Sequence, residues 1–423
     1  MSSSQNFSWN SLDNAAKIFP CATDKRDTKV FRFVCELREA AEPLVLKEAL
    51  LQTLEEFPLF RSVLRRGLFW YYLQQTDLEP VVAQEHEPPC SQLYNGNSRG
   101  LLFRVTYFQK RINLEIYHAL TDGTGAMVFF KTLVSHYLAA RYGFEKDPAC
   151  LPAVTDASEK QKTDDSFQHY YTGKGLHAGR KQPRAFRIRG LKTPVNRLRV
   201  ISGAVSAKAV LELSHRHETT LTLFLAGVMA CAIEKTMSAH DRRRPVVVAI
   251  PVNLRNYFPS QSLRNFFSVV NVSYSFGGAP ASLQEVIDSF AAQLKDALTK
   301  ENLEERLNRL MALEKNVVMR MVPLFLKDPV MHYFYHHADN TCTVSLSNLG
   351  KVDLPAPLRP YVRLFEVYVS TAKVQMCSCT FQDTLMLSFT SAFLQSDVQM
   401  EFFRMLEQMG VACEITANRI DEE

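Results

Sequence analysis

The clearest pattern of hydrophobic and polar residues surrounds His118. Apolar and polar residues alternate over 112–117, which is the period of a half-buried strand. This alternation places His118 on the apolar face, where the strand ends. Beyond Gly123, apolar residues recur at helical spacing over 127–138. The sequence therefore predicts a strand, a tight turn that begins with His118, and a helix.

The same two periods predict an α/β unit in the first part of the chain. The predicted strands are 31–37, 59–64, 68–73, 101–108 and 112–118, and the predicted helices are 43–57 and 124–142. A mixture of short strands with two longer helices indicates a sheet covered by helices.

A second, larger unit follows a stretch without clear periodicity. Residues 148–200 lose the hydrophobic pattern, apart from a short helix expected at 166–171. Strands are then predicted at 199–205, 245–251, 267–276, 341–346, 364–369, 374–381 and 384–389. Helices are predicted at 207–215, at 221–237, from 282 with breaks to about 321, and from Ser396 to Gly410. We therefore predict an N-terminal lobe (1–175), an interlobe crossing (176–198) and a C-terminal lobe (199–423).

Length and composition agree with two lobes of a globular protein. A chain of 423 residues is too long for one ordinary core, and 46% hydrophobic with 22% charged residues is typical of globular proteins. The polar segment 1–14 lacks an apolar signal core, and the apolar run 221–233 is too short to span a bilayer. Nine cysteines, an odd number with no Cys-x-x-Cys pair, favour a reducing compartment. We expect a cytoplasmic protein without a membrane segment.

Positive charge is concentrated in the crossing between the lobes. The net charge is only +5, but residues 174–199 hold nine Lys or Arg and no acidic residue. This run could bind RNA, an acidic carrier protein or the phosphates of coenzyme A, or it could be a solvated linker. Nucleic acid is the least favoured partner, because Phe186 alone supplies an aromatic ring inside the dense part.

His118 is the first candidate for chemistry. An imidazole at the edge of a core is partly desolvated, so the ring should be neutral near pH 7 and able to accept a proton. Gly123 would allow unusual dihedral angles or a close backbone approach. The alternative is a core histidine followed by a helix that Asp122 caps.

Three segments occur in the order found in one known superfamily. They are His118 to Gly123, which reads HxxxDG, then Pro251 to Arg255 with Asn271 downstream, and Ser347 to Gly350; a Trp70-Tyr71-Tyr72 hairpin accompanies them. With these segments the chain resembles the condensation-domain and alcohol acetyltransferase branch of the chloramphenicol-acetyltransferase-like superfamily. The resemblance extends over nearly the whole chain.

This resemblance implies a fold and a reaction. The fold is a two-lobed, V-shaped α/β pseudo-dimer, each lobe a mixed sheet covered by helices, with the histidine in a channel at the lobe interface. The reaction transfers an acyl group, acetyl being the first candidate, from a thioester to an alcohol or amine. Tyr117 replaces the first histidine of the condensation-domain signature, which favours O-acyl transfer over amide formation. About three hundred residues follow His118, so the second lobe could complete the site and a monomer would suffice.

The resemblance also assigns roles to individual residues. His118 would be the general base, and Asp122 would pair with Arg255 to fix the turn. Arg255 could instead clamp a phosphate of coenzyme A. Ser347 and Asn348 would donate to an oxyanion, unless they form an ordinary turn.

Cofactors and partners follow from the same comparison. No cofactor would be bound permanently, and acyl-coenzyme A or an acyl carrier protein thioester would be the cosubstrate. The acceptor would be a small alcohol or amine. No metal site is expected, because His118 and Asp122 lack a third ligand nearby. A rival hypothesis is a non-catalytic relative that binds a carrier protein or a small ligand in the channel.

Overall fold

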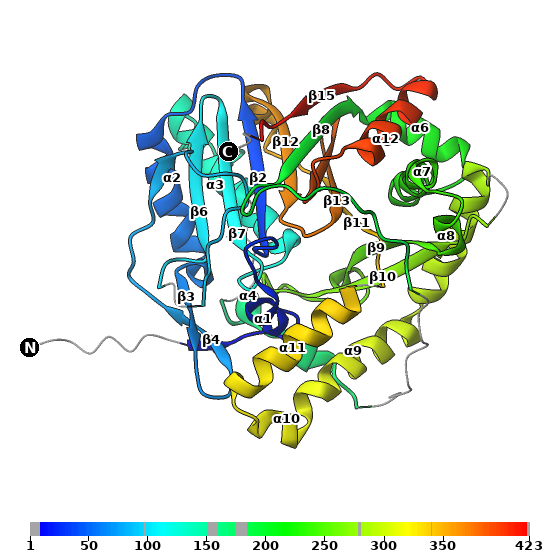
Figure 1. Cartoon of the computed structure of the whole chain (residues 1–423). Helices are drawn as coiled ribbons and strands as arrows, with labels where there is room; N and C mark the ends of the chain where they lie inside the picture. Colours follow the sequence, from blue (N-terminus) through cyan, green and yellow to red (C-terminus); the bar gives the residue numbers. More distant parts are fainter. Residues whose placement is uncertain are drawn as a thin grey trace, which may run out of the picture.

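The structure is a computed structural model that describes residues 9–96, 99–150, 159–173, 184–277, 281–339 and 341–420. Two sheets stand side by side, and each carries helices on its outer side (Figure 1). The N-terminal half of the chain forms most of one unit and the C-terminal half forms the other. The predicted two-lobed α/β architecture is confirmed.

The first sheet has five strands in the order β12-β2-β7-β6-β5. Its strands are β2 (Val30–Leu37), β5 (Val82–Gln84), β6 (Phe103–Phe108), β7 (Arg111–Tyr117) and β12 (Val362–Val369). Neighbouring strands are antiparallel, except that β5 and β6 are parallel. Two helices pack on this sheet, α2 (Pro43–Glu56) and α3 (Gly123–Tyr142).

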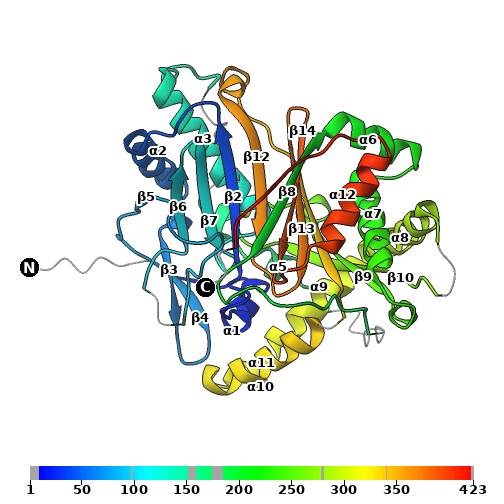
Figure 2. The ribbon, with the colours of Figure 1, turned by 45° about the horizontal axis from the view of Figure 1, so that its top comes forward.

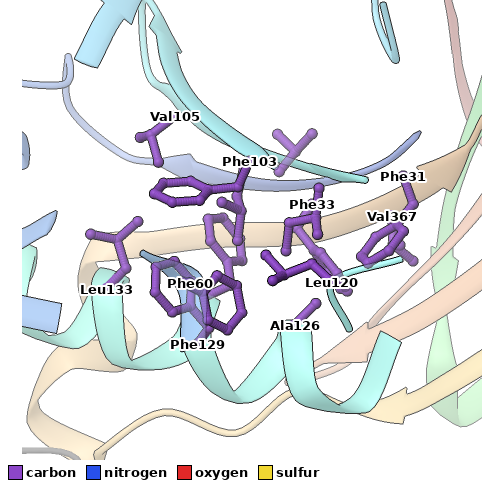
Figure 3. Close-up of a cluster of buried hydrophobic side chains, with 14 of the residues drawn as sticks. Phe31, Phe33, Phe60, Phe103, Val105, Leu120, Ala126, Phe129, Leu133 and Val367 are labelled. Atoms are coloured by element: carbon purple, nitrogen blue, oxygen red, sulfur yellow. The ribbon is translucent and has the colours of Figure 1, made fainter. Parts of the chain in front are cut away.

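Aromatic packing fixes α3 on the first sheet. Phe129 of α3 stacks on Phe60 with ring centroids 3.9 Å apart, and Phe103 of β6 contacts both rings (Figure 3). All three side chains are buried. Aromatic pairs of this kind contribute stability beyond their buried area. Because α3 starts directly after the His118 turn, this cluster fixes the position of that turn.

Strand β7 is buried on both faces, so the prediction of a half-buried strand is wrong. Glu115 has no exposed surface, although the alternation placed it on the polar face. Arg32 and Arg104 both donate to its carboxylate, and so does the backbone N–H of Cys90. A buried carboxylate is tolerated when cations and donors surround it in this way.

The second sheet has seven strands in the order β10-β9-β11-β13-β14-β8-β15. These are β8 (Arg199–Ser206), β9 (Val246–Asn253), β10 (Phe267–Tyr274), β11 (Val344–Lys351), β13 (Val374–Phe381), β14 (Thr384–Ser391) and β15 (Glu414–Ala417). Strand β11 runs parallel to both β9 and β13, and the other pairs are antiparallel. Its helices include α6 (Ala207–Arg216), α7 (Leu221–Thr236), α8 (Leu283–Ala297) and α12 (Asp397–Gln408). Ser282 forms a capping box with Glu285 at the start of α8, whereas Ser396 makes no side-chain cap to α12.

Several elements lie outside the periodic patterns in the sequence. A small sheet joins β1 (Trp9–Ser11), β4 (Tyr71–Gln75) and β3 (Ser62–Arg66). The short helices are α1 (Phe19–Ala22), α4 (Glu159–Thr163), α5 (Ser166–Tyr170) and α10 (Val317–Met321), and the longer ones are α9 (Lys300–Lys315) and α11 (Leu324–Asp339). Strands β1, β5 and β15 and helices α1, α4 and α11 were not predicted.

The two units share one strand. Although β12 belongs to the C-terminal half of the chain, it pairs with β2 in the first sheet and contacts β13 and β14 of the second. At this junction the buried Glu366 carboxylate accepts hydrogen bonds from Ser202 of β8 and Ser388 of β14. The division at residue 199 stays a prediction, and β12 ties the second half to the first sheet.

Two further expectations concern segments outside the sheets. Residues 174–183 of the basic crossing lie outside the described residues, so its role in binding stays a prediction. Within the described ranges no single helix is long and apolar enough to span a membrane, although α6 and α7 reach that length and composition as a pair bent by 83°.

Candidate active site

His118 begins the turn between β7 and α3 and sits among aromatic rings. Its backbone N–H donates to the carbonyl oxygen of Lys29 at 2.8 Å. The imidazole stacks on Phe19 with centroids 4.5 Å apart, and Phe31 and Phe267 contact it from other directions. Burial among these rings lowers the pKa of His118 below its ordinary 6.5, because the charged form loses hydration. The residue as a whole is only half-buried.

Asn265 determines which nitrogen of the ring carries the proton. The Nδ2 group of Asn265 donates to the carbonyl oxygen of His118 at 3.1 Å and to Asp13 Oδ2 at 3.3 Å. Its Oδ1 therefore faces His118 Nδ1, 3.1 Å away, and must accept a hydrogen bond from an Nδ1–H group. With the proton on Nδ1, the lone pair of Nε2 is available as a base.

The buried carboxylate of Asp13 holds Asn265 by a hydrogen bond. Asp13 has no exposed surface and accepts from the backbone N–H of Ala16 at 2.7 Å. Burial raises the pKa of Asp13 to about 6, although the Arg264 cation 3.5 Å away opposes that rise. The arrangement His118–Asn265–Asp13 thus orients the imidazole through an amide.

Asp122 has two structural tasks in the same turn. Its Oδ1 accepts from the backbone N–H groups of Thr124 and Gly125 and thereby caps α3. Its Oδ2 lies 2.7 Å from Nη1 of Arg255 and accepts from the backbone N–H of Phe266 at 2.9 Å. The pair expected from the resemblance is present, and the capping role is present beside it.

Arg255 has no donor left for a phosphate. Its Nη1 donates to Asp122 and to Asn253, its Nε to the carbonyl oxygen of Ser262, and its Nη2 to those of Ser262 and Arg264. All five N–H groups of the guanidinium are thus engaged inside the protein. The alternative interpretation of Arg255 as a phosphate clamp is therefore wrong.

Two glycines allow close approach to the turn. A methyl group added to Gly123 would lie 2.8 Å from the end of the Leu349 side chain of β11. One added to Gly125 would lie 2.2 Å from the carbonyl oxygen of Leu263 and 2.3 Å from Oγ1 of Thr121. Gly123 thus provides the predicted close approach, and Gly125 faces the stricter obstacle because backbone cannot move aside as a side-chain tip can.

The segment expected to supply oxyanion donors differs from the prediction. Ser347 to Gly350 lie within β11 rather than in a turn after it, because the strand continues through an irregularity between Asn348 and Lys351. The Asn348 amide donates to Thr222 at 3.0 Å and accepts from Ser378. The roles of Ser347 and Asn348 stay predictions.

Sequence reasoning missed Asn265, Asp13 and Gly125. Asn265 lies 147 residues from His118 in a polar stretch that looks like an ordinary loop. Conversely, Tyr117, which replaces the first histidine of the signature, is buried and bonds to Thr23 at 2.8 Å. Of the predicted set, His118, Asp122, Gly123 and Arg255 are brought together.

A cavity of about 600 Å³ lies on the β1 side of this region. Its lining includes Trp70, Tyr71, Lys17 and Arg320. Ser11 also lines this cavity, and it precedes Asp13 by two residues in the sequence. The channel at His118 itself stays a prediction. Within the described ranges no three His, Cys, Asp or Glu side chains are arranged to hold a metal ion.

Replacing Asp122 by Asn should destabilise the protein by about 3–5 kcal/mol, because it leaves the largely buried Arg255 without its anion. Asp353→Asn is the matched control, since Asp353 pairs with Arg359 at the surface and is 61% exposed. The control should change the free energy of unfolding by less than about 1 kcal/mol. Chemical denaturation measures both; equal small effects would contradict the structural role of Asp122.

Gly125→Ala should destabilise the protein by about 2 kcal/mol or more, since the methyl group would overlap a backbone carbonyl. Gly123→Ala should cost much less, because the Leu349 side chain can rotate and alanine favours the helix. Thermal melting of the two variants checks this order. The reverse order would show that the 261–264 segment does not pack against α3 as described.

Comparison with known proteins identifies the fold. No protein-family model and no curated protein sequence matches the chain. Among solved structures it is similar to TRI101 of F. graminearum complexed with coenzyme A and T-2 mycotoxin (12% identity, TM-score 0.65, covering 96% of this chain and 99% of that one). It is also similar to polyketide synthase associated protein 5 from Mycobacterium tuberculosis (15%, 0.59, 94% and 96%).

The first condensation domain of the CDA synthetase is a third similar structure (14% identity, TM-score 0.59, covering 96% of this chain and 99% of that one). The likeness to all three spans nearly the full length of both partners in each comparison. The chain therefore has the two-lobed fold of condensation domains and acetyltransferases, as the HxxxDG stretch and its companion segments predicted.

Proposed function

We propose that this protein is an acyltransferase that moves an acyl group from a thioester donor to the hydroxyl group of a small alcohol, with His118 as general base. Acetyl is the first candidate for the acyl group. The observation that carries the proposal is the hydrogen bond from His118 Nδ1 to Asn265, which leaves Nε2 unprotonated. A merely structural histidine would not need its tautomer selected by a buried, supported amide.

The first step forms the new bond. Nε2 of His118 takes the proton of the acceptor hydroxyl while its oxygen attacks the thioester carbonyl carbon. The carbonyl oxygen becomes an oxyanion, and the imidazole becomes an imidazolium whose Nδ1–H is still held by Asn265. General-base help of this kind accelerates reactions by about 10²–10⁴-fold.

The second step releases the thiol. The oxyanion re-forms the carbonyl, the carbon–sulfur bond breaks, and the departing sulfur takes the proton from Nε2. An ester and a free thiol result, and His118 returns to its neutral state. The lowered pKa of His118 favours this return, because an imidazolium in an apolar surrounding readily gives up its proton.

The donor and acceptor are proposed from the similar structures. TRI101 was solved with coenzyme A and T-2 mycotoxin, and a starter condensation domain of rhizomide synthetase was solved with C8-CoA and Leu-SNAC. We infer that acyl-coenzyme A or a carrier-protein thioester is the cosubstrate here. An amine acceptor is the second candidate, since the same base could serve it, but a tyrosine at position 117 favours the alcohol.

A binding protein without catalysis is the rival. It would need the fold and the channel but not a selected histidine tautomer. The intact base, the intact ion pair and the close fit at Gly125 weigh against this rival.

His118→Ala should lower kcat/KM for thioester-dependent product by about 10²–10⁴-fold, since it removes the base. Thiol release from acetyl-coenzyme A with a panel of alcohols and amines, read with a thiol-reactive dye, measures this. His240→Ala, at an exposed position, is the matched control and should leave turnover unchanged. Turnover near the wild-type level in His118→Ala would defeat the proposal.

The pH profile should place the acid limb of kcat/KM below pH 6.5. Desolvation lowers the pKa of His118, so the ring stays neutral and active until the pH falls below that value. Asn265→Ala removes a hydrogen-bond acceptor that stabilises the charged imidazolium and so raises the pKa of His118. The acid limb of this variant should therefore shift to still lower pH. Its plateau should fall about tenfold or more because the ring loses its orientation. A wild-type acid limb above pH 6.5 would contradict the role of His118 as base. An unchanged plateau in Asn265→Ala would contradict the role of Asn265 in orienting the ring.

A further inference from the structure

Helix α11 has its polarity reversed relative to an ordinary surface helix. Three of its polar side chains point into the protein: Lys327 lies 3.7 Å from the ring centroid of Trp70, Asp328 accepts from Tyr71 at 2.8 Å, and Tyr335 bonds to Lys29 at 2.7 Å. A helix on a globular surface normally buries its apolar stripe and exposes its polar one. Here the body of the protein holds the helix by its polar side.

The outward side of α11 is a continuous apolar stripe. The exposed apolar residues of α11 follow the spacing of one helix face over about three turns. They are Phe325, Leu326, Pro329, Val330, Tyr333 and Phe334. Among the described side chains of α11, His332 and His337 are also exposed. Phe325, Tyr333 and Phe334 are each more than 60% exposed. Single exposed apolar residues are common, but a stripe of this length marks an interaction site.

Neighbouring elements extend the stripe into a larger surface. Val317 and Met321 of α10 are about 70% exposed, and Leu68 at the β3–β4 turn is 63% exposed. The carbonyl oxygen of Leu68 accepts from the N–H of Leu324 at 2.8 Å, so the turn abuts the start of α11. We call these residues together with the stripe the α10–α11 face. Helices α10 and α11, which bear most of this face, lie at the lower edge of the molecule in Figure 2.

The exposed Lys, Arg, Asp and Glu side chains described in residues 315–337 have one sign. Among the described side chains of residues 315–337, the exposed charged ones are the cations Lys315 and Arg320, and the acidic Asp328 is turned inward to Arg66. An apolar helix face with aromatic residues and flanking cations is the pattern of helices that lie in the plane of an anionic membrane surface.

We propose that the α10–α11 face docks on a lipid bilayer that carries anionic headgroups. Phe325, Val330 and Phe334 would enter the boundary of the acyl chains, while Lys315 and Arg320 would lie at headgroup level. This binding is peripheral and needs no spanning segment.

A bilayer fits this face better than a second copy of the chain or another protein. Protein interfaces usually carry a direct hydrogen bond for every 100–200 Å² or so. In the α11 stripe the Tyr333 hydroxyl is the one polar side-chain group, whereas acyl chains require no partner.

Direct contacts connect the α10–α11 face with the candidate active site. Helix α11 packs on α1, and Phe19 of α1 stacks on His118. Tyr335 of α11 holds Lys29, whose carbonyl oxygen accepts from His118. The docking itself does not depend on the proposed acyl transfer, and a binding experiment tests it separately.

The test is flotation of the full-length protein with vesicles of phosphatidylcholine and phosphatidylglycerol, and with vesicles of phosphatidylcholine alone. We expect binding to the mixed vesicles that weakens as salt is raised. Phe325→Glu with Phe334→Glu should weaken binding about tenfold or more. Leu44→Glu with Leu191→Glu, two exposed leucines elsewhere, is the matched control and should bind like the wild type. Circular dichroism and thermal melting establish that both double variants are folded.

Three outcomes would overturn the proposal. One is no flotation of the wild type with either vesicle. Another is equal flotation of Phe325→Glu with Phe334→Glu and the control. The third is a wild-type dimer in sedimentation that this same variant converts to a monomer, with no lipid binding, since a second copy would then cover the face.

Discussion

The structure depends on the docking of the 253–266 segment against the turn that carries His118. Arg255 neutralises Asp122, Asn265 holds both the ring and the backbone of His118, and the carbonyl oxygen of Leu263 accepts from Thr121. These polar groups are largely withdrawn from water, so each would be costly without its partner. The partners of the turn come from more than 130 residues away in the chain.

Two effects act together on the imidazole of His118. Aromatic burial keeps the ring neutral, and the Asn265 oxygen fixes its proton on Nδ1. Burial alone would give a neutral ring of undefined tautomer, and a carboxylate in the place of Asn265 would favour the charged ring. An amide supported by buried Asp13 gives orientation without adding a full charge next to the base.

Much of the fold followed from the sequence, because strand and helix periods are local properties. The alternation over 112–117 and the helical spacing after Gly123 gave β7 and α3, and the HxxxDG stretch gave the architecture by resemblance. Asn265 could not be found in this way, since its partner is distant and its own neighbourhood is polar. Helix α11 was missed for a different reason. It exposes its apolar side and buries its polar side, so the rule that identifies surface helices does not apply to it, and Pro329 interrupts the pattern.

Nitrogen NMR on protein with ¹⁵N-labelled histidine observes the protonation state of His118 directly. The signal is assigned by its loss in His118→Gln. We expect a neutral ring at pH 7 with the proton on Nδ1 and an unprotonated Nε2, which titrates below pH 6.5. A proton on Nε2 at pH 7, or a ring already charged there, would contradict it.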